Sequence, residues 1–251
     1  YAPYFWQPIM NLGNIFNNFI NNIAYLERIF ETMDEPVTVK DAKDAVEMPK
    51  IRGEVTFDHV NFSYDASKQI LNDVSFTVKP GESVALVGPT GAGKSTIVNL
   101  ISRFYNVNGG RVLIDGQDIS QVTIHSLREQ MGIMMQDSFI FSGDIEDNIR
   151  YGKLDATHEE IVKASRTVCA DEFISKMPDR YQTEVRERGS MLSQGQKQLI
   201  SFARTLLSDP AILILDEATS SIDVQTEKAL QTGLNAMLKG RTSFIIAHRL
   251  S

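Results

Sequence analysis

A lysine, several hydroxyl side chains and three glycines lie close together in the stretch GPTGAGKST, residues 88–96. Their spacing matches the phosphate-binding pattern G-x-x-x-x-G-K-[ST], and the stretch lies between an expected short strand and an expected helix. The glycines allow backbone N–H groups to curl around phosphate oxygens without steric clash. Lys94 reaches the terminal phosphates of a nucleotide, and Ser95 offers a hydroxyl to Mg²⁺. The predicted nucleotide-binding residues here are Gly88, Pro89, Thr90, Gly91, Ala92, Gly93, Lys94, Ser95 and Thr96.

Two adjacent carboxylates, Asp216 and Glu217, follow an apolar run at 212–215 that predicts a buried strand. Because buried carboxylates without partners are costly, such a pair indicates a bound cation or a reacting water. Asp216 is predicted to hold Mg²⁺ beside the phosphates, directly or through water. Glu217 is the candidate general base, and a solvated carboxylate at the mouth of the strand is the alternative interpretation.

A second candidate anion site is the start of an expected helix at 193–207. Ser193 with Gln196 three residues later forms a capping-box pattern, which predicts that a helix begins there. Apolar residues then recur at helical spacing and give one stripe, formed by Leu199, Phe202, Ala203, Leu206 and Leu207. Because a helix start carries partial positive charge and free N–H groups, it can hold an anion.

These three features together resemble the motifs of the nucleotide-binding domain of ATP-binding-cassette (ABC) transporters. The stretch LSQGQ, residues 192–196, stands where that family has its signature, usually written L-S-G-G-Q. Gln194 replaces the first glycine of the usual signature, whereas Gly195, the glycine nearest the helix start, remains. The resemblance covers about residues 50–251 and extends to the exporter branch of the family.

The resemblance implies that two such domains pack head to tail. In that arrangement, Ser193, Gly195 and Gln196 of one domain cap the nucleotide that the phosphate loop of the other domain holds. One chain then carries two anion sites, one for its own ATP and one for the ATP of its partner. The partner is either an identical copy or a homologue.

Five further features match the family position by position. Tyr64 corresponds to the aromatic residue that stacks on adenine, and a tyrosine on a strand face is the alternative. Gln136 corresponds to the glutamine that contacts Mg²⁺ or the attacking water, and His248 to the histidine that touches the γ-phosphate. The stretch SSID, 220–223, matches the loop that crosses the dimer. The stretch TEVRERG, 183–189, resembles the exporter segment that links to the membrane domain.

The elements that must position these residues are short apolar strands alternating with helices. A β-rich part is expected from Glu54, a mostly helical part at about 137–209, and apolar strands at 212–215 and 243–247. This alternation predicts a mainly parallel sheet covered on both faces. With the resemblance, the expected fold class is α/β: a P-loop NTPase core with a mainly parallel sheet, an N-terminal antiparallel β subdomain and an inserted α-helical subdomain.

The segment before this core has a different pattern. Apolar and asparagine side chains fall on separate faces of residues 4–33, which predicts a long amphipathic helix. It either packs on its own domain or is the cytoplasmic end of a membrane-crossing segment. The resemblance favours the second: 1–35 is expected to be the end of the last transmembrane-domain helix, 36–50 a linker, and 51–251 a nucleotide-binding domain truncated at its C-terminus.

Composition limits the function classes. The 251 residues are 42% hydrophobic and carry a net charge of −7, which fits a globular protein without an electrostatic footprint for nucleic acid. A single cysteine, Cys169, excludes an internal disulfide and favours a reducing compartment. No window reaches the ~20 apolar residues that span a bilayer. Because the chain starts at Tyr1 without a leader pattern, we interpret it as part of a longer protein.

The expected function is that of an ABC exporter domain which binds and hydrolyses ATP with Mg²⁺. Its expected partners are a second nucleotide-binding domain and a fused transmembrane domain in the cell membrane, with this domain on the cytoplasmic side. The alternatives are a soluble ABC ATPase, an importer subunit and a non-hydrolysing ATP-binding switch. The acidic charge counts against a nucleic-acid ATPase, the leading helix against an importer subunit, and Glu217 and His248 against the switch. A GTPase is disfavoured because the sequence has no N-K-x-D motif.

Overall fold

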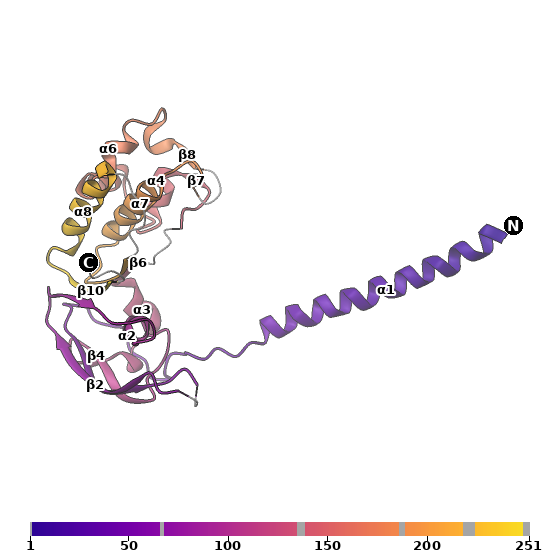
Figure 1. The fold of residues 1–251 in the computed structure, drawn as a ribbon, viewed down its shortest axis with the longest axis horizontal. Coiled ribbons are helices and arrows are strands. Elements are labelled where there is room, and N and C mark those ends of the chain that lie inside the picture. The colour runs from indigo at the N-terminus through magenta and orange to yellow at the C-terminus, as the bar shows by residue number, and fades with distance from the viewer. Residues whose placement is uncertain (1, 66–67, 135–138, 186–188, 218–223, 248–251) are drawn as a thin grey trace. The chain divides into compact units, whose positions relative to one another are not determined.

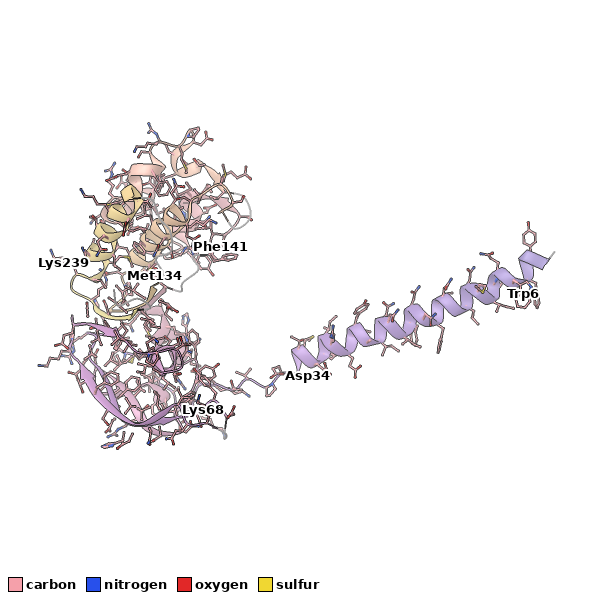
Figure 2. The ribbon with its side chains drawn as sticks, in the orientation of Figure 1. Trp6, Asp34, Lys68, Met134, Phe141 and Lys239 are labelled. Atoms are coloured by element: carbon pink, nitrogen blue, oxygen red, sulfur yellow. The ribbon has the colours of Figure 1, made fainter. Side chains whose placement is uncertain are left out.

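The computed structural model divides the chain into two units, Tyr1–Lys40 and Asp41–Ser251. The residues that it describes are 2–65, 68–134, 139–185, 189–217 and 224–247. The first unit contains the long helix α1, Ala2–Met33, which carries Trp6 near its start (Figures 1 and 2). Large apolar side chains are exposed along this helix. In the described part of the chain, no helix combines the length and apolarity that crossing a membrane requires.

An antiparallel sheet in the second unit has the strand order β2-β1-β4-β5. Its strands are β1 (Val55–Phe62), β2 (Leu71–Val78), β4 (Gly109–Ile114) and β5 (Gln117–Asp118). The register between β1 and β2 shifts after Phe57, and His59 has a positive φ of 51°. Because of this bulge, Phe57 and Val60 are both buried although they are three positions apart. The predicted N-terminal antiparallel β subdomain is confirmed.

The second sheet is parallel, with the strand order β3-β10-β9-β6. Its strands are β3 (Ser83–Leu86), β6 (Met131–Met134), β9 (Ile212–Glu217) and β10 (Thr242–Ala247). Ile212 and Ile214 of β9 point into one apolar core, which β1 and α2 share, whereas Leu213 and Leu215 point into a second core among the helices. Burial of both faces explains the uninterrupted apolar run, and the predicted parallel sheet is confirmed.

Helices complete the second unit, and α4, α7 and α8 gather at one end of it (Figure 1). They are α2 (Lys94–Ile101), α3 (Ile124–Glu129), α4 (Ile145–Arg150), α5 (His158–Thr167), α6 (Asp171–Ile174), α7 (Gln194–Leu207) and α8 (Val224–Leu238). Short elements join them: 3₁₀ helices η1 (Ile119–Gln121) and η2 (Arg180–Gln182), and strands β7 (Gly143–Asp144) and β8 (Glu184–Val185). Helices α4, α5 and α7 bury Ile149, Ile161 and Ile200 in the second core, which confirms the expected α-helical subdomain.

The segment that follows Lys40 is part of the second unit and packs on the rest of it. Val46 forms a parallel bridge with Val122, and the backbone N–H of Met48 donates to Ser126 Oγ at 2.7 Å. Met48 and Ile51 are buried in the first core. The ordered second unit therefore includes residues 41–50 as well as the β-rich part that follows them.

Candidate nucleotide-binding site

The glycine-rich loop joins β3 to α2, and α2 begins at Lys94 directly after it. Gly88 and Gly93 have positive φ angles of 149° and 88°, which residues with side chains rarely adopt. A Cβ added at Gly93 would lie 2.9 Å from Leu71 Cδ2, and one at Gly88 would lie 3.1 Å from Ala92 Cβ. Glycine is therefore needed at both positions to keep the loop in a shape that can wrap an anion.

The start of α2 presents hydrogen-bond donors to this loop. Lys94 Nζ donates to the carbonyl oxygens of Gly88 at 2.8 Å and Pro89 at 3.1 Å, so its ammonium group is folded over the loop. The N-cap residue Gly93 has no side chain that would accept from the first N–H groups of the helix. The loop thus has backbone N–H groups and the Lys94 ammonium group close together. Donors of this kind are suited to binding phosphate oxygens.

Ser95 and Thr96, the next residues of α2, lie in different surroundings. Ser95 is exposed, whereas Thr96 is buried with 5% of its surface accessible. Thr96 Oγ1 lies 3.1 Å from the hydroxyl oxygen of Tyr64, and the two groups share a hydrogen bond. The structure therefore brings Tyr64 together with the helix that carries the phosphate loop.

Asp216 lies at the edge of the parallel sheet from which the phosphate loop starts. Ile246 of β10 pairs with Leu86 of β3 on one side and with Asp216 of β9 on the other. These three residues form one row across the sheet, so the Cα atoms of Leu86 and Asp216 are two strand spacings, or roughly 10 Å, apart. The carboxylate of Asp216 thus belongs to the same end of the sheet as Gly88–Lys94.

Several predicted residues fall outside the described part of the chain. They are Gln136, the stretch 220–223 and His248, and only part of the stretch 183–189 is described. Glu217 is the last residue of β9, directly after Asp216, and its backbone alone is described. Since β6 ends at Met134 and β10 at Ala247, the chain enters the segments that contain Gln136 and His248 from this same edge.

The second predicted anion site is the exposed start of α7. Ser193 is its N-cap: Ser193 Oγ accepts from the N–H of Gln196 at 3.2 Å, and Gln196 Oε1 accepts from the N–H of Ser193 at 2.9 Å. The expected capping box is thereby confirmed. It satisfies the N–H of Gln196, whereas the N–H groups of the exposed Gln194 and the buried Gly195 have no partner within the helix.

Sequence reasoning did not single out Arg204, which holds α7 against α4 and the segment at 139–141. Its guanidinium donates to the carbonyl oxygens of Asn148 at 2.8 Å and Phe139 at 3.0 Å, and to Asn148 Oδ1 at 3.1 Å. Burial lowers the pKa of Arg204 because desolvation disfavours the charged form. The one signal in the sequence that could have revealed this contact is a charged residue placed between the apolar positions Ala203 and Leu206.

A glycine-rich loop at the carboxyl end of a parallel sheet, continuous with a helix start, defines this domain as a P-loop nucleotide-binding domain. The family model described as ABC transporter matches residues 71–220, more than half of the chain. The chain belongs to the ABC transporter family.

Individual relatives agree with this assignment. The chain is 54% identical over 251 residues to the ABC transporter ATP-binding protein YknV of Bacillus subtilis, a match that covers 100% of this chain and 42% of the relative. It is 45% identical to the fatty acid ABC transporter ATP-binding/permease protein of Mycobacterium tuberculosis, over 100% of this chain and 40% of that protein. A bacterial Atm1-family ABC exporter solved with ATP bound is 42% identical with a TM-score of 0.81, over 97% of this chain and 43% of that chain.

The chain therefore spans about two fifths of the length of these relatives. The expected resemblance is confirmed, as is the expected P-loop fold class. The names of the relatives combine ATP binding with a permease or an exporter, which supports a nucleotide-binding domain of the exporter type. They do not favour a soluble ABC ATPase or an importer subunit.

Proposed function

We propose that this domain hydrolyses ATP with Mg²⁺ and that the hydrolysis drives export by the full-length protein. The observation that carries the proposal is the row Leu86, Ile246 and Asp216, because it aligns a carboxylate with the start of the phosphate loop. A nucleotide held by the loop then has a cation ligand at the same end of the sheet. The ATP-bound state of the Atm1-family exporter, 42% identical to this chain, supports the choice of nucleotide.

The residues present fit Mg²⁺, because the exposed hydroxyl of Ser95 and the carboxylate of Asp216 are the oxygen ligands this cation takes. We assign both to it, together with the side-chain oxygen of Gln136. When bound, Mg²⁺ neutralises negative charge on the phosphates. Lys94 exchanges its bonds to the carbonyls of Gly88 and Pro89 for bonds to the terminal phosphates.

Hydrolysis needs a positioned water and a group that takes its proton. Glu217 follows Asp216 at the end of β9, and we assign to its carboxylate the role of general base. We assign to His248, which follows β10, the contact with the γ-phosphate. Phosphoryl transfer depends on positioning and charge compensation more than on covalent chemistry, so these few groups are sufficient.

The start of α7 completes the site of a second domain in this proposal. Ser193 and Gln194 are exposed, and the capping box leaves two N–H groups of the first turn for an anion. We propose that they cap the ATP bound to the phosphate loop of a partner domain packed head to tail, either a second copy or a homologue. The site is then complete only in the closed pair, which couples turnover to dimerisation.

The remaining parts of the proposal concern the full-length protein. We propose that 1–35 is the cytoplasmic end of the last helix of a fused transmembrane domain, 36–50 a linker whose residues 41–50 pack on the domain that follows, and 51–251 the nucleotide-binding domain. The exposed apolar side chains of α1 support a helix that continues into a membrane domain. Phe139, Phe141 and Tyr151 form an exposed aromatic cluster beside α7 that is suited to contact cytoplasmic loops of that domain.

The test is Glu217→Gln in the full-length protein. Because the amide cannot take a proton, steady-state phosphate release is expected to fall about 100-fold or more while ATP binding persists. Glu159→Gln, at an exposed position of α5, is the matched control and should keep the wild-type rate. Unchanged hydrolysis in Glu217→Gln would show that the general base is assigned wrongly.

A further inference from the structure

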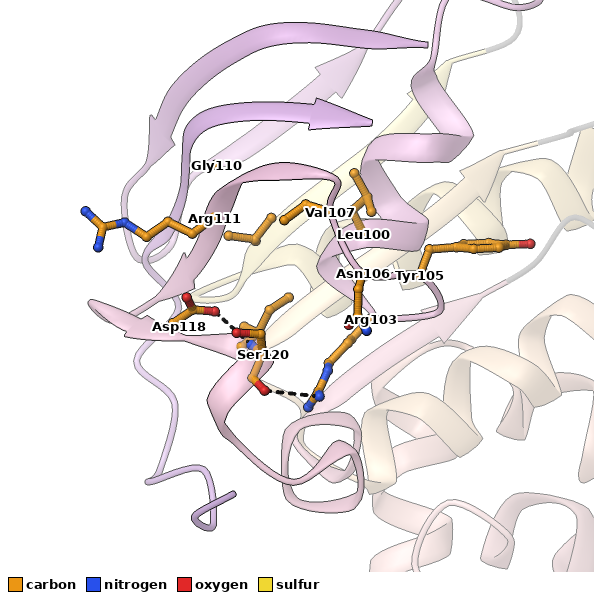
Figure 3. Close-up of a pocket in the computed structure, with 11 residues that line it drawn as sticks. Leu100, Arg103, Tyr105, Asn106, Val107, Gly110, Arg111, Asp118 and Ser120 are labelled. Atoms are coloured by element: carbon orange, nitrogen blue, oxygen red, sulfur yellow. Dashed lines mark hydrogen bonds between the residues drawn. The ribbon is translucent and has the colours of Figure 1, made fainter. Parts of the chain in front are cut away.

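The chain reverses direction at the end of α2, and two arginines hold this turn. Arg103 has a left-handed φ of 50° and is 2% exposed. Its guanidinium donates to the carbonyl oxygen of Val122. It also donates to the carbonyl oxygen of Ser120 at 3.1 Å (Figure 3). Arg128 donates to the carbonyl oxygens of Ser102 at 3.0 Å and Arg103 at 2.9 Å. A left-handed backbone at a residue other than glycine is costly, and these hydrogen bonds help to maintain it.

This turn fixes where Tyr105 lies. Figure 3 shows the Tyr105 side chain extending from the end of α2 in a direction different from that of Arg103. Its ring packs edge-on against Tyr64, with the centroids 4.9 Å apart and an interplanar angle of 84°. It also contacts Phe62 at 5.8 Å. Tyr105 therefore lies against the residue that is expected to stack on adenine.

The ring of Tyr64 is held on three sides. Phe62 packs edge-on against it at 4.9 Å and 86°, and Tyr105 contacts it as described above. Its hydroxyl shares a hydrogen bond with Thr96 Oγ1 at 3.1 Å and accepts one from Asn99 Nδ2 at 3.5 Å, both within the phosphate-loop helix. Edge-to-face contacts are favourable because the positive edge of one ring meets the negative face of another. Since Tyr64 remains 49% exposed, part of its surface is open to a ligand.

We infer that Tyr105 is a positioning residue of the nucleotide site: it fixes the orientation of the Tyr64 ring on which the base stacks. The inference rests on the proposed nucleotide site and on the stacking role that the resemblance implies for Tyr64. Phe62 and Thr96, which also support Tyr64, are buried and serve the core or the phosphate loop as well. Tyr105 is 42% exposed, so its replacement changes the base contact with little effect on the core.

Loss of Tyr105 is therefore expected to weaken the contribution of the base to binding without changing the contribution of the phosphates. Without Tyr105, the Tyr64 ring gains rotational freedom that a stacked base must remove again. The energy of one aromatic pair of this kind corresponds to a loss of about 3- to 10-fold in the affinity for a nucleotide. The phosphate loop is untouched, so a ligand that has phosphates and no base is bound as before.

The experiment measures the affinity of the full-length protein for ATP and for inorganic triphosphate by competition with a fluorescent nucleotide. Tyr105→Ala and Tyr64→Ala are expected to weaken ATP binding by about 3-fold or more, and Tyr105→Ala is expected to leave triphosphate binding unchanged. Tyr105→Phe keeps the ring and is the matched control, which should bind both ligands as the wild type does. If Tyr105→Ala loses triphosphate binding through misfolding, Tyr105→Leu, which keeps bulk without an aromatic face, repeats the test.

Three results would overturn the inference, and they are distinguishable. If Tyr64→Ala weakens ATP binding and neither Tyr105→Ala nor Tyr105→Leu does, Tyr64 stacks on the base without help from Tyr105. If Tyr64→Ala has no effect on ATP binding, the proposed role of Tyr64 fails, and the role of Tyr105 fails with it. An equal loss of ATP and triphosphate affinity in both Tyr105 variants would also contradict the inference, because it would place the effect at the phosphate loop.

Discussion

Single buried polar side chains fix the helical part of the domain, and Glu146 of α4 is an example. Its side chain is 8% exposed and accepts hydrogen bonds from His158 Nδ1 at 2.7 Å and Gln182 Nε2 at 2.9 Å. Arg150, one turn further along α4, forms an ion pair with it. Burial alone would raise the pKa of Glu146, but these hydrogen bonds and the charge of Arg150 outweigh burial and lower that pKa below its ordinary value of 4.5. One carboxylate thus joins α4, α5 and η2.

The lowered pKa predicts how stability depends on pH. A carboxyl group with a lowered pKa in the folded state contributes stability above its ordinary pKa, and this contribution is lost as pH falls through the lowered value. The free energy of unfolding is therefore expected to decline below about pH 4.5, and less steeply in Glu146→Gln. Urea denaturation between about pH 3 and pH 7 measures it, with the exposed Glu159→Gln as control. Identical pH profiles for Glu146→Gln and the wild type would contradict this assignment.

At the scale of elements, Arg204 joins the helix that begins at the signature to the segment at 139–141. Asn148 of α4 completes this contact, because its side chain also exchanges hydrogen bonds with the backbone of Phe141 at 2.8 and 2.9 Å. Gly152 allows the close approach of α7, since a Cβ there would lie 2.0 Å from the carbonyl oxygen of Arg204. The segment at 139–141 and α7 are therefore joined by direct hydrogen bonds.

Arg204→Ala is expected to lower the free energy of unfolding by about 2 kcal/mol or more, because three hydrogen bonds to a charged group are lost and buried acceptors remain. Arg204→Lys should not restore stability, since one ammonium group cannot reproduce the planar fork of the guanidinium. Chemical denaturation measures both variants against Arg166→Ala, whose side chain is mostly exposed. Wild-type stability in Arg204→Lys would mean that charge alone, rather than the fork, holds the contact.

Elements with a strong local pattern were predictable from the sequence. The capping box at Ser193 and the apolar run of β9 each have a pattern that burial or capping imposes directly. The break in alternation within β1 also has a local cause, the bulge near His59. The packing of 41–51 on the second unit was not predictable, because it depends on contacts such as that of Ile51 with Gln130, far away in sequence. The roles of Tyr105 and Arg204 likewise depend on contacts with residues far away in sequence, so no motif marks them.

At the scale of the whole molecule, the two proposed anion sites of one chain differ in their chemistry. The phosphate loop belongs to the parallel sheet, whereas the start of α7 is an exposed helix terminus with a complete capping box. The capping box itself offers only backbone N–H groups, whereas the phosphate loop ends at Lys94 and lies at the same end of the sheet as Asp216. This difference is the reason for assigning ATP binding to the loop and the capping of a partner's ATP to α7.

The most direct test of this central claim is a cysteine crosslink in the full-length protein, with Cys169→Ser removing the native thiol and Glu217→Gln slowing turnover. Ser193→Cys in one copy and Thr90→Cys in the other are expected to form a disulfide between copies when ATP is added, and little without it. Ser175→Cys, at an exposed position of the helical part, is the matched control in place of Ser193→Cys. The account predicts an ATP-dependent crosslink for the Ser193 pair alone; equal crosslinking from both positions, or none from Ser193 with ATP bound, would contradict it.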